Sequence, residues 1–168
     1  ILILTICFAN MIVSGPLYQV SFSKSFYTNE FERLDVYTYF SEDKDKVNNE
    51  FFKVVDYVKG EGEEIGSDFF NEKEKTHLKD VRDIFTFIRW VLILSFVAAS
   101  LTIYYALKHM KRKEGKGIVI TGIMNGSIIS LISIIILIIS ISIDFSSVFT
   151  WMHHMLFSNE LWMMDFWT

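Results

Sequence analysis

The sequence predicts an α-helical multi-span membrane protein with a small extracellular α+β domain, and three observations lead to this fold class. Of the 168 residues, 51% are apolar, and they gather in long runs that carry no charge. These runs cover residues 1–23, 90–107 and 117–143. Each run approaches or exceeds the roughly 20 residues that a helix needs to cross about 30 Å of hydrocarbon. The charged residues cluster between the runs.

We therefore predict transmembrane helices at residues 1–20, 89–107 and 117–143. The first run is too long for the apolar core of a typical secretory signal, which favours a span. The loop at residues 108–116 carries five basic side chains and one acidic side chain. Such a basic excess in a short loop predicts that this loop is cytoplasmic.

Residues 21–88 and 144–168 then lie on the extracellular side. Residues 24–89 agree with this orientation, because they hold 16 acidic and 11 basic side chains. Tryptophan favours the membrane interface, and every tryptophan of the chain lies at or beyond the predicted outer boundary: Trp90, Trp151, Trp162 and Trp167.

The ends and the composition set further limits. Ile1 lies inside an apolar run and Thr168 follows an aromatic-rich stretch, so we expect a further segment before the first residue and a fourth span after the last. Cys7 is the only cysteine, which excludes an internal disulfide and a cysteine-based metal site. A net charge of −4 gives no general footprint for nucleic acid.

Residues 21–88 predict one strand and one helix before a longer helix begins. Phe31–Phe40 is rich in aromatic and β-branched residues, which is typical of a strand. Ser41 is a candidate N-cap for the next helix, and Gly60 is a natural stop for it. The apolar positions of that helix recur at helical spacing: Val47, Phe51, Val54, Val55 and Val58.

A long helix is predicted to begin after Asn71. Asn71 and Glu74 match the N-cap and N3 positions of a capping box. No glycine or proline follows until Gly115, so this helix should continue unbroken from the outer domain through the membrane. His77 and Asp80 lie on one face of it by their i, i+3 spacing.

Two further patterns occur towards the end of the chain. Gly122 and Gly126 have GxxxG spacing, which favours close helix packing over a catalytic role for Asn125. After Asp144, one helical face should place His153 inward and leave the neighbouring histidine on another side; this face contains Phe149, Met152, His153, Leu156 and Phe157.

His77 and His153 are candidates for an acid–base pair. His77 precedes Trp90 by several helical turns, and His153 follows Ile143 by somewhat fewer. Straight helices would lift the two histidines about 20 and 15 Å from these boundaries, so two separate elements can bring them to a similar height. The simpler alternative is that each imidazole only bonds a carboxylate.

Other chemistries have weaker support. A metal-ligand set of His77, Asp80 and His153 has no sequence signature, and adjacent residues such as His153 and His154 diverge by about 100° on a helix. No GxSxG nucleophile motif is present. An acid–base pair of histidines at the lipid surface remains, and no cofactor is expected.

Two segments carry a family resemblance. Residues 74–82 read EKTHLKDVR and enter a span, while residues 149–157 read FTWMHHMLF and are followed by NELWMMD at residues 159–165. In this order, and on one side of the membrane, they resemble the bacterial lipoprotein intramolecular transacylase (Lit) family of four-span membrane proteins with an outer globular domain. Phe166 stands where the family usually has proline, and the fourth span is absent from this chain.

The resemblance implies a membrane acyltransferase of the bacterial cell membrane with an extracellular active site. Its substrate would be the diacylated N-terminus of a lipoprotein, whose sn-2 acyl chain moves to the cysteine α-amine and leaves a lyso-form lipoprotein. An α-amine has a pKa of about 7.7–8.0 and a histidine about 6.5, so a modest base is sufficient. No covalent enzyme intermediate is required, because the nucleophile and the ester belong to one molecule.

The family's motifs implicate His77 and His153 as the catalytic pair, with one accepting a proton and the other donating one. Asp80 either holds the His77 imidazole in one tautomer or belongs to a polar patch. Arg82 either meets lipid phosphate or pairs with a carboxylate. Asn159 either donates to the oxyanion or forms a turn that Asp165 closes.

His154 is interpreted as a bystander. The alternative hypothesis is a non-catalytic envelope membrane protein whose outer domain binds a ligand or metal. An intramembrane protease is disfavoured, since the spans contain no pair of aspartates.

Overall fold

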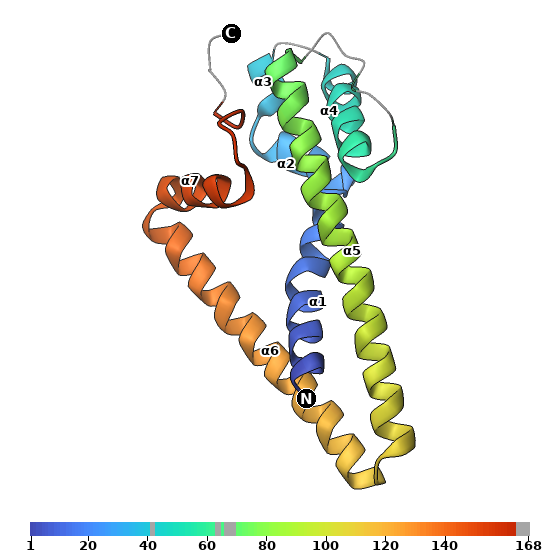
Figure 1. Cartoon of the computed structure of the whole chain (residues 1–168). Coiled ribbons are helices and arrows are strands. Elements are labelled where there is room, and N and C mark those ends of the chain that lie inside the picture. The colour runs from blue at the N-terminus through green and yellow to red at the C-terminus, as the bar shows by residue number, and fades with distance from the viewer. Residues whose placement is uncertain (41–42, 63–64, 66–69, 164–168) are drawn as a thin grey trace. The chain divides into compact units, whose positions relative to one another are not determined.

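A computed structural model describes residues 1–40, 43–62, 65 and 70–163, and the described residues are helical throughout, with short connections (Figure 1). The helices are α1 (Leu2–Ser21), α2 (Lys24–Arg33), α3 (Val36–Phe40), α4 (Lys44–Lys59), α5 (Glu72–His109), α6 (Arg112–Ile143) and α7 (Phe145–Leu156). The chain divides into two compact units. We call residues 1–17 with 88–152 the membrane unit, and residues 18–87 with 153–168 the head unit.

Three helices are long and apolar enough to cross a membrane, namely α1, α5 and α6. The prediction of one unbroken helix after Asn71 is confirmed, because α5 continues for 38 residues. Its apolar part begins at Trp90. The first part of α5 therefore belongs to the head unit and carries His77 and Asp80.

Close packing of α1 on α6 organises the membrane unit. A Cβ atom on Gly122 would lie 2.5 Å from the Cβ of Leu4, and one on Gly126 would lie 2.8 Å from the Cβ of Phe8. Both distances are too short for real side chains, so only glycine permits this approach. The packing role predicted from the GxxxG spacing is confirmed.

Polar side chains reinforce this packing inside the apolar layer. The buried hydroxyl of Ser130 donates to the carbonyl oxygens of Gly126 at 2.9 Å and of Ala9 at 3.2 Å. The Asn10 amide on α1 donates to the Ser95 hydroxyl on α5 at 3.0 Å. These bonds satisfy polar groups that lipid could not satisfy.

The predicted α+β head is wrong, because the described residues contain no strand. Phe31 ends up in α2, and Val36–Phe40 forms the short helix α3. Asp35, at φ 54°, separates the two helices. Phe31 packs edge-on against Phe51 of α4, with 5.0 Å between ring centroids. A helix bonds its own backbone, whereas a single strand would leave its ladder unpaired.

The helix α4 follows the predicted pattern more closely. Val47, Val55 and Val58 are buried, and the chain leaves the helix at Gly60 with φ 97°. This left-handed conformation favours glycine. The predicted cap Ser41 lies outside the described residues, and the described N-cap is Asp43, whose carboxylate accepts from the Asp45 amide.

The predicted capping box at the start of α5 is confirmed. The backbone N–H of Asn71 donates to the Glu74 carboxylate at 2.8 Å, and the N–H of Glu74 donates to the Asn71 side-chain oxygen at 3.0 Å. Two of the free N–H groups of this helix end are thereby satisfied. The helix then packs on the core of the head unit, which contains Phe22, Val54, Tyr57, Val58, Ile65, Phe70, Leu78, Val81 and Phe85.

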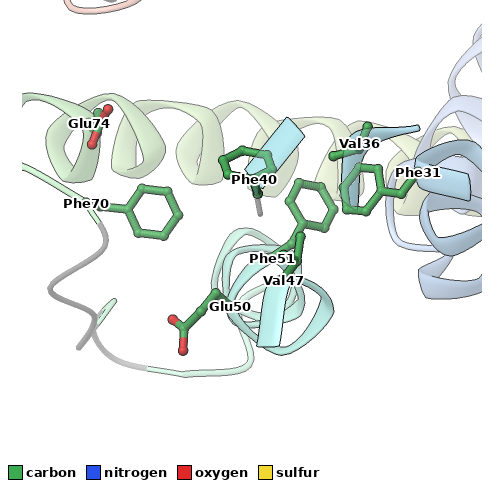
Figure 2. Close-up of a pocket in the computed structure, with 8 residues that line it drawn as sticks. All are labelled: Phe31, Val36, Phe40, Val47, Glu50, Phe51, Phe70 and Glu74. Atoms are coloured by element: carbon green, nitrogen blue, oxygen red, sulfur yellow. The ribbon is translucent and has the colours of Figure 1, made fainter. Parts of the chain in front are cut away.

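An apolar cavity of about 320 Å³ lies in the head unit. Figure 2 shows its aromatic side chains gathered between α4 and α5, with the Glu50 and Glu74 carboxylates towards one end. No histidine lines this cavity. Its lining is Phe31, Val36, Phe40, Val47, Glu50, Phe51, Phe70 and Glu74.

The glycine contacts predict that a Gly→Ala substitution in α6 destabilises the protein, although the same substitution stabilises most helices. In a helix, Gly→Ala normally stabilises by about 0.5–1 kcal/mol. We expect Gly122→Ala to destabilise by about 1–3 kcal/mol instead, because the added methyl overlaps Leu4. Thermal unfolding in detergent measures this. Gly117→Ala in the same helix is the control, since a Cβ there meets open space. Equal melting temperatures for the two variants would contradict the packing.

Candidate functional site

Helix α5 places His77 in its second turn, within the head unit. The side chain is half-buried. Among the described residues, no group makes a hydrogen bond with its buried Nδ1. A buried polar atom without a protein partner carries a free-energy cost, and such atoms occur where a ligand or a reaction uses them. His77 is therefore available to a group that enters the site.

Helix α7 supplies the second imidazole from its last turn. The carboxylate of Asp144 caps this helix by accepting from the Ser147 backbone N–H at 3.0 Å. His153 lies on the buried side of the helix and is only 9% exposed, whereas the neighbouring His154 is exposed. The predicted inward position of His153 agrees with this burial.

The other members of the predicted face differ in burial. Phe157 is part-buried, whereas Phe149, Met152 and Leu156 are exposed, so the predicted inward position is wrong for these three. The helical spacing correctly groups these apolar side chains, but spacing cannot say what covers them.

The structure brings His77 and His153 together although they lie far apart in the chain. Their ring centroids lie 6.5 Å apart and their planes differ by 29°. Nearly stacked rings at this distance are too far apart for a direct hydrogen bond. A small reacting group between them could meet both imidazoles.

Two aromatic side chains that we did not predict as site residues surround the histidines. The Phe157 ring lies 4.8 Å from His77 and 5.6 Å from His153, and the Trp162 ring lies 4.7 Å from His153. Phe157 follows His153 by four positions, which puts both on one helical face. That spacing was a usable signal, whereas the return of Trp162 onto His153 depends on the turn between them.

The turn after α7 is fastened to α5 by side-chain contacts. The Asn159 amide donates to the Asp80 carboxylate at 2.9 Å, while its oxygen accepts from the Leu161 N–H at 3.0 Å. Lys73 adds a bond to the Met163 carbonyl at 2.6 Å. Asn159 therefore forms a turn, and Asp80 receives that turn rather than the Nδ1 of His77.

Arg82, another predicted site residue, does not contact the two histidines. The Arg82 guanidinium lies over the Tyr57 ring, 4.8 Å from its centroid, and donates to the Gly62 carbonyl at 3.1 Å. Asp165 lies outside the described residues. In the part of the chain that the structure describes, no group of three or more His, Cys, Asp or Glu side chains is placed to hold a metal ion.

Burial sets the protonation of His77. Partial burial lowers the pKa of this imidazole, the nearby Asp80 charge raises it to a smaller extent, and His153 lowers it further. His77 lies several helical turns before the apolar part of α5 and is thus outside the membrane-spanning segment. The lowered pKa favours the uncharged imidazole, which can accept a proton.

Comparisons with known proteins agree with this architecture. A family model described as lipoprotein intramolecular transacylase Lit matches residues 2–168. The fold is similar to a solved structure of the membrane-integral lipoprotein intramolecular transacylase Lit from Bacillus cereus, with TM-score 0.84, 23% identity, and coverage of 98% of this chain and 74% of that chain.

A second solved structure shows the Bacillus cereus protein with one substitution. It has TM-score 0.71 and 22% identity, and the match covers 98% of this chain and 71% of that chain. At these identities the two structures establish the fold. No curated protein matches the chain.

The contact between Asn159 and Asp80 predicts a charge-dependent loss of stability. Asn159→Asp places two carboxylates at hydrogen-bond distance, so we expect a loss of about 1–3 kcal/mol near neutral pH. Thermal unfolding of the purified protein measures it.

The paired variant Asp80→Asn with Asn159→Asp is the control. It exchanges donor and acceptor, and the carboxylate at position 159 still accepts from Leu161. Stability should return towards that of the unchanged protein. A paired variant that is no more stable than Asn159→Asp alone would show that the two side chains do not act together.

Proposed function

We propose a function that follows from one finding: this chain belongs to the lipoprotein intramolecular transacylase (Lit) family. The proposed reaction moves the sn-2 acyl chain of a diacylglyceryl lipoprotein to the α-amine of its N-terminal cysteine. The protein is an acyltransferase of the membrane. The separation of 6.5 Å between the His77 and His153 rings is the observation that supports a two-histidine mechanism. We place this site on the extracellular side, as the basic loop at residues 108–116 predicts.

The reaction begins with proton removal from the substrate's α-ammonium. Burial keeps His77 uncharged, which suits this imidazole to accept the proton. The freed nitrogen attacks the carbonyl carbon of the sn-2 ester. A C–N bond forms, the bond from the carbonyl carbon to the sn-2 oxygen breaks, and that oxygen leaves with a proton. His153, the second imidazole, is placed to donate this proton. The nitrogen still carries one proton too many after it bonds to carbon, and it returns that proton to His153 as the amide forms.

No acyl group needs to rest on the enzyme. The amine and the ester belong to one molecule, and well-oriented intramolecular reactions reach effective molarities of about 10⁵–10⁸ M. Holding the two groups between the imidazoles can therefore supply much of the acceleration. The absence of a recognisable nucleophile motif in the sequence is consistent with this mechanism.

The aromatic surroundings favour aminolysis over hydrolysis. Phe157 contacts both imidazoles, and Trp162 covers His153. These rings leave little room for water near the ester. Family membership in the transacylases gives no support to the alternative of a non-catalytic envelope protein that binds a ligand or metal.

Removal of either imidazole is expected to abolish the reaction. His77→Ala and His153→Ala should each stop formation of the N-acylated lyso product, which mass spectrometry of a co-expressed lipoprotein detects. His154→Ala is the matched control, because His154 neighbours His153 but is exposed, and it should keep activity. Normal product from either His77→Ala or His153→Ala would refute the proposal.

The protonation of His77 predicts an acidic limit to activity. The rate should stay high while His77 is uncharged and fall as the pH drops through its lowered pKa. Because the Asp80 charge raises this pKa, Asp80→Asn should move the acidic limb to lower pH. The amide at position 80 can still accept from Asn159, so the turn should remain in place. A limb that moves to higher pH in this variant would contradict the assignment.

A further inference from the structure

Helix α7 has two chemically different sides. At 100° per residue, its apolar side chains fall on one arc and its polar side chains on the other. The apolar arc is Phe145, Val148, Phe149, Trp151, Met152, Met155 and Leu156. The polar arc is Ser146, Ser147, Thr150, His153 and His154.

Several large side chains of the apolar arc are exposed among the described residues. Trp151 is 65% exposed, while Phe145 and Met155 are each 61% exposed. Large apolar side chains gathered in this way on a protein surface mark contact with another apolar phase. The buried residue of the helix is instead a polar one, His153.

The position of α7 in the chain identifies that phase as lipid. The apolar helix α6 is long enough to cross a bilayer and ends at Ile143, and only Asp144 separates it from α7. The start of α7 therefore lies at the end of a span, at the membrane boundary. With 12 residues, α7 is about 18 Å long and too short to span. Its polar arc also requires water.

We propose that α7 is an interfacial helix that lies in the plane of the membrane, with its apolar arc inserted among the lipids and its polar arc facing away from the hydrocarbon. Helices of this kind insert about 5–10 Å into the boundary between headgroups and acyl chains. Because α7 contains no Lys or Arg, its attachment depends on apolar contact and not on anionic lipid.

The location of α7 affects the proposed reaction, and this step of the inference rests on the proposed function. The lipid-bound helix carries His153 on its polar arc, near the depth at which a diacylglyceryl ester meets water. The membrane itself then sets the height of one imidazole. The depth of α7 then becomes a determinant of turnover beside the Asn159–Asp80 contact.

Site-specific quenching tests the location of α7. In the full-length protein with Cys7→Ala, single cysteines at 145 and 151 sample the apolar arc, and single cysteines at 146 and 150 sample the polar arc. Each is labelled with a fluorophore in phosphatidylcholine nanodiscs. Lipids brominated near the headgroup should quench the labels at 145 and 151 several-fold more than those at 146 and 150, with or without added phosphatidylglycerol.

Three outcomes would overturn the proposal. Equal lipid quenching on both arcs would show that α7 does not lie in the interface. Labels at 145 and 151 that are shielded from both brominated lipid and aqueous iodide would show that protein covers the arc. Quenching that appears only with phosphatidylglycerol would show electrostatic attachment.

An activity measurement separates this inference from the histidine mechanism. Trp151→Lys puts a charge on the apolar arc, and Ser146→Lys puts the same charge on the polar arc. We expect the first to reduce lipoprotein conversion at least about fivefold and the second to leave it nearly unchanged. Equal activity of the two variants would contradict a role for α7 depth, even if His77→Ala and His153→Ala are inactive. Conversely, active histidine variants combined with arc-specific quenching would refute the mechanism and leave α7 in the interface.

Discussion

The site depends on the attachment of the turn after α7 to the start of α5. Asn159 donates to Asp80 at 2.9 Å across 79 positions of the chain, and this contact closes the segment that carries His153, Phe157 and Trp162. Without this contact, nothing would hold the second imidazole close to His77. The rigid part of the site is the capped first turns of α5, and the turn is held against them by two side-chain bonds.

The proposed chemistry follows from this attachment. Two imidazoles on independent elements can be held a substrate's width apart, whereas two histidines on one helix would have a spacing fixed by the helix itself. Aromatic rings then replace water around them, which favours the uncharged form of His77. A modest base and a proton donor are sufficient for an amine and an ester that already belong to one molecule.

Local sequence signals predicted much of the fold. The capping box at Asn71, the stop at Gly60 and the packing of Gly122 and Gly126 each depend on a few neighbouring residues or on one helix face. The predicted strand at residues 31–40 failed because aromatic composition alone does not provide a partner strand, and these rings pack on α4 instead.

The candidate site was harder to predict, for the same physical reason. His77 and His153 could be identified as a pair by their expected heights and their motifs. The contacts made by Trp162 and by Asn159 depend on a turn whose path no periodicity records. The exposure of Phe149 and Met152 also could not be predicted, because an apolar arc has the same spacing whether protein or lipid covers it.

In the proposed mechanism, the substrate's amine and sn-2 oxygen meet between His77 and His153. An experimental structure of the full-length protein with an unreactive analogue, in which an ether replaces the sn-2 ester, tests it directly. We expect the amine nitrogen within about 2.6–3.2 Å of one imidazole and the sn-2 oxygen at a similar distance from the other. An analogue bound with both atoms away from the two rings, for example in the apolar cavity beside Phe51, would contradict it.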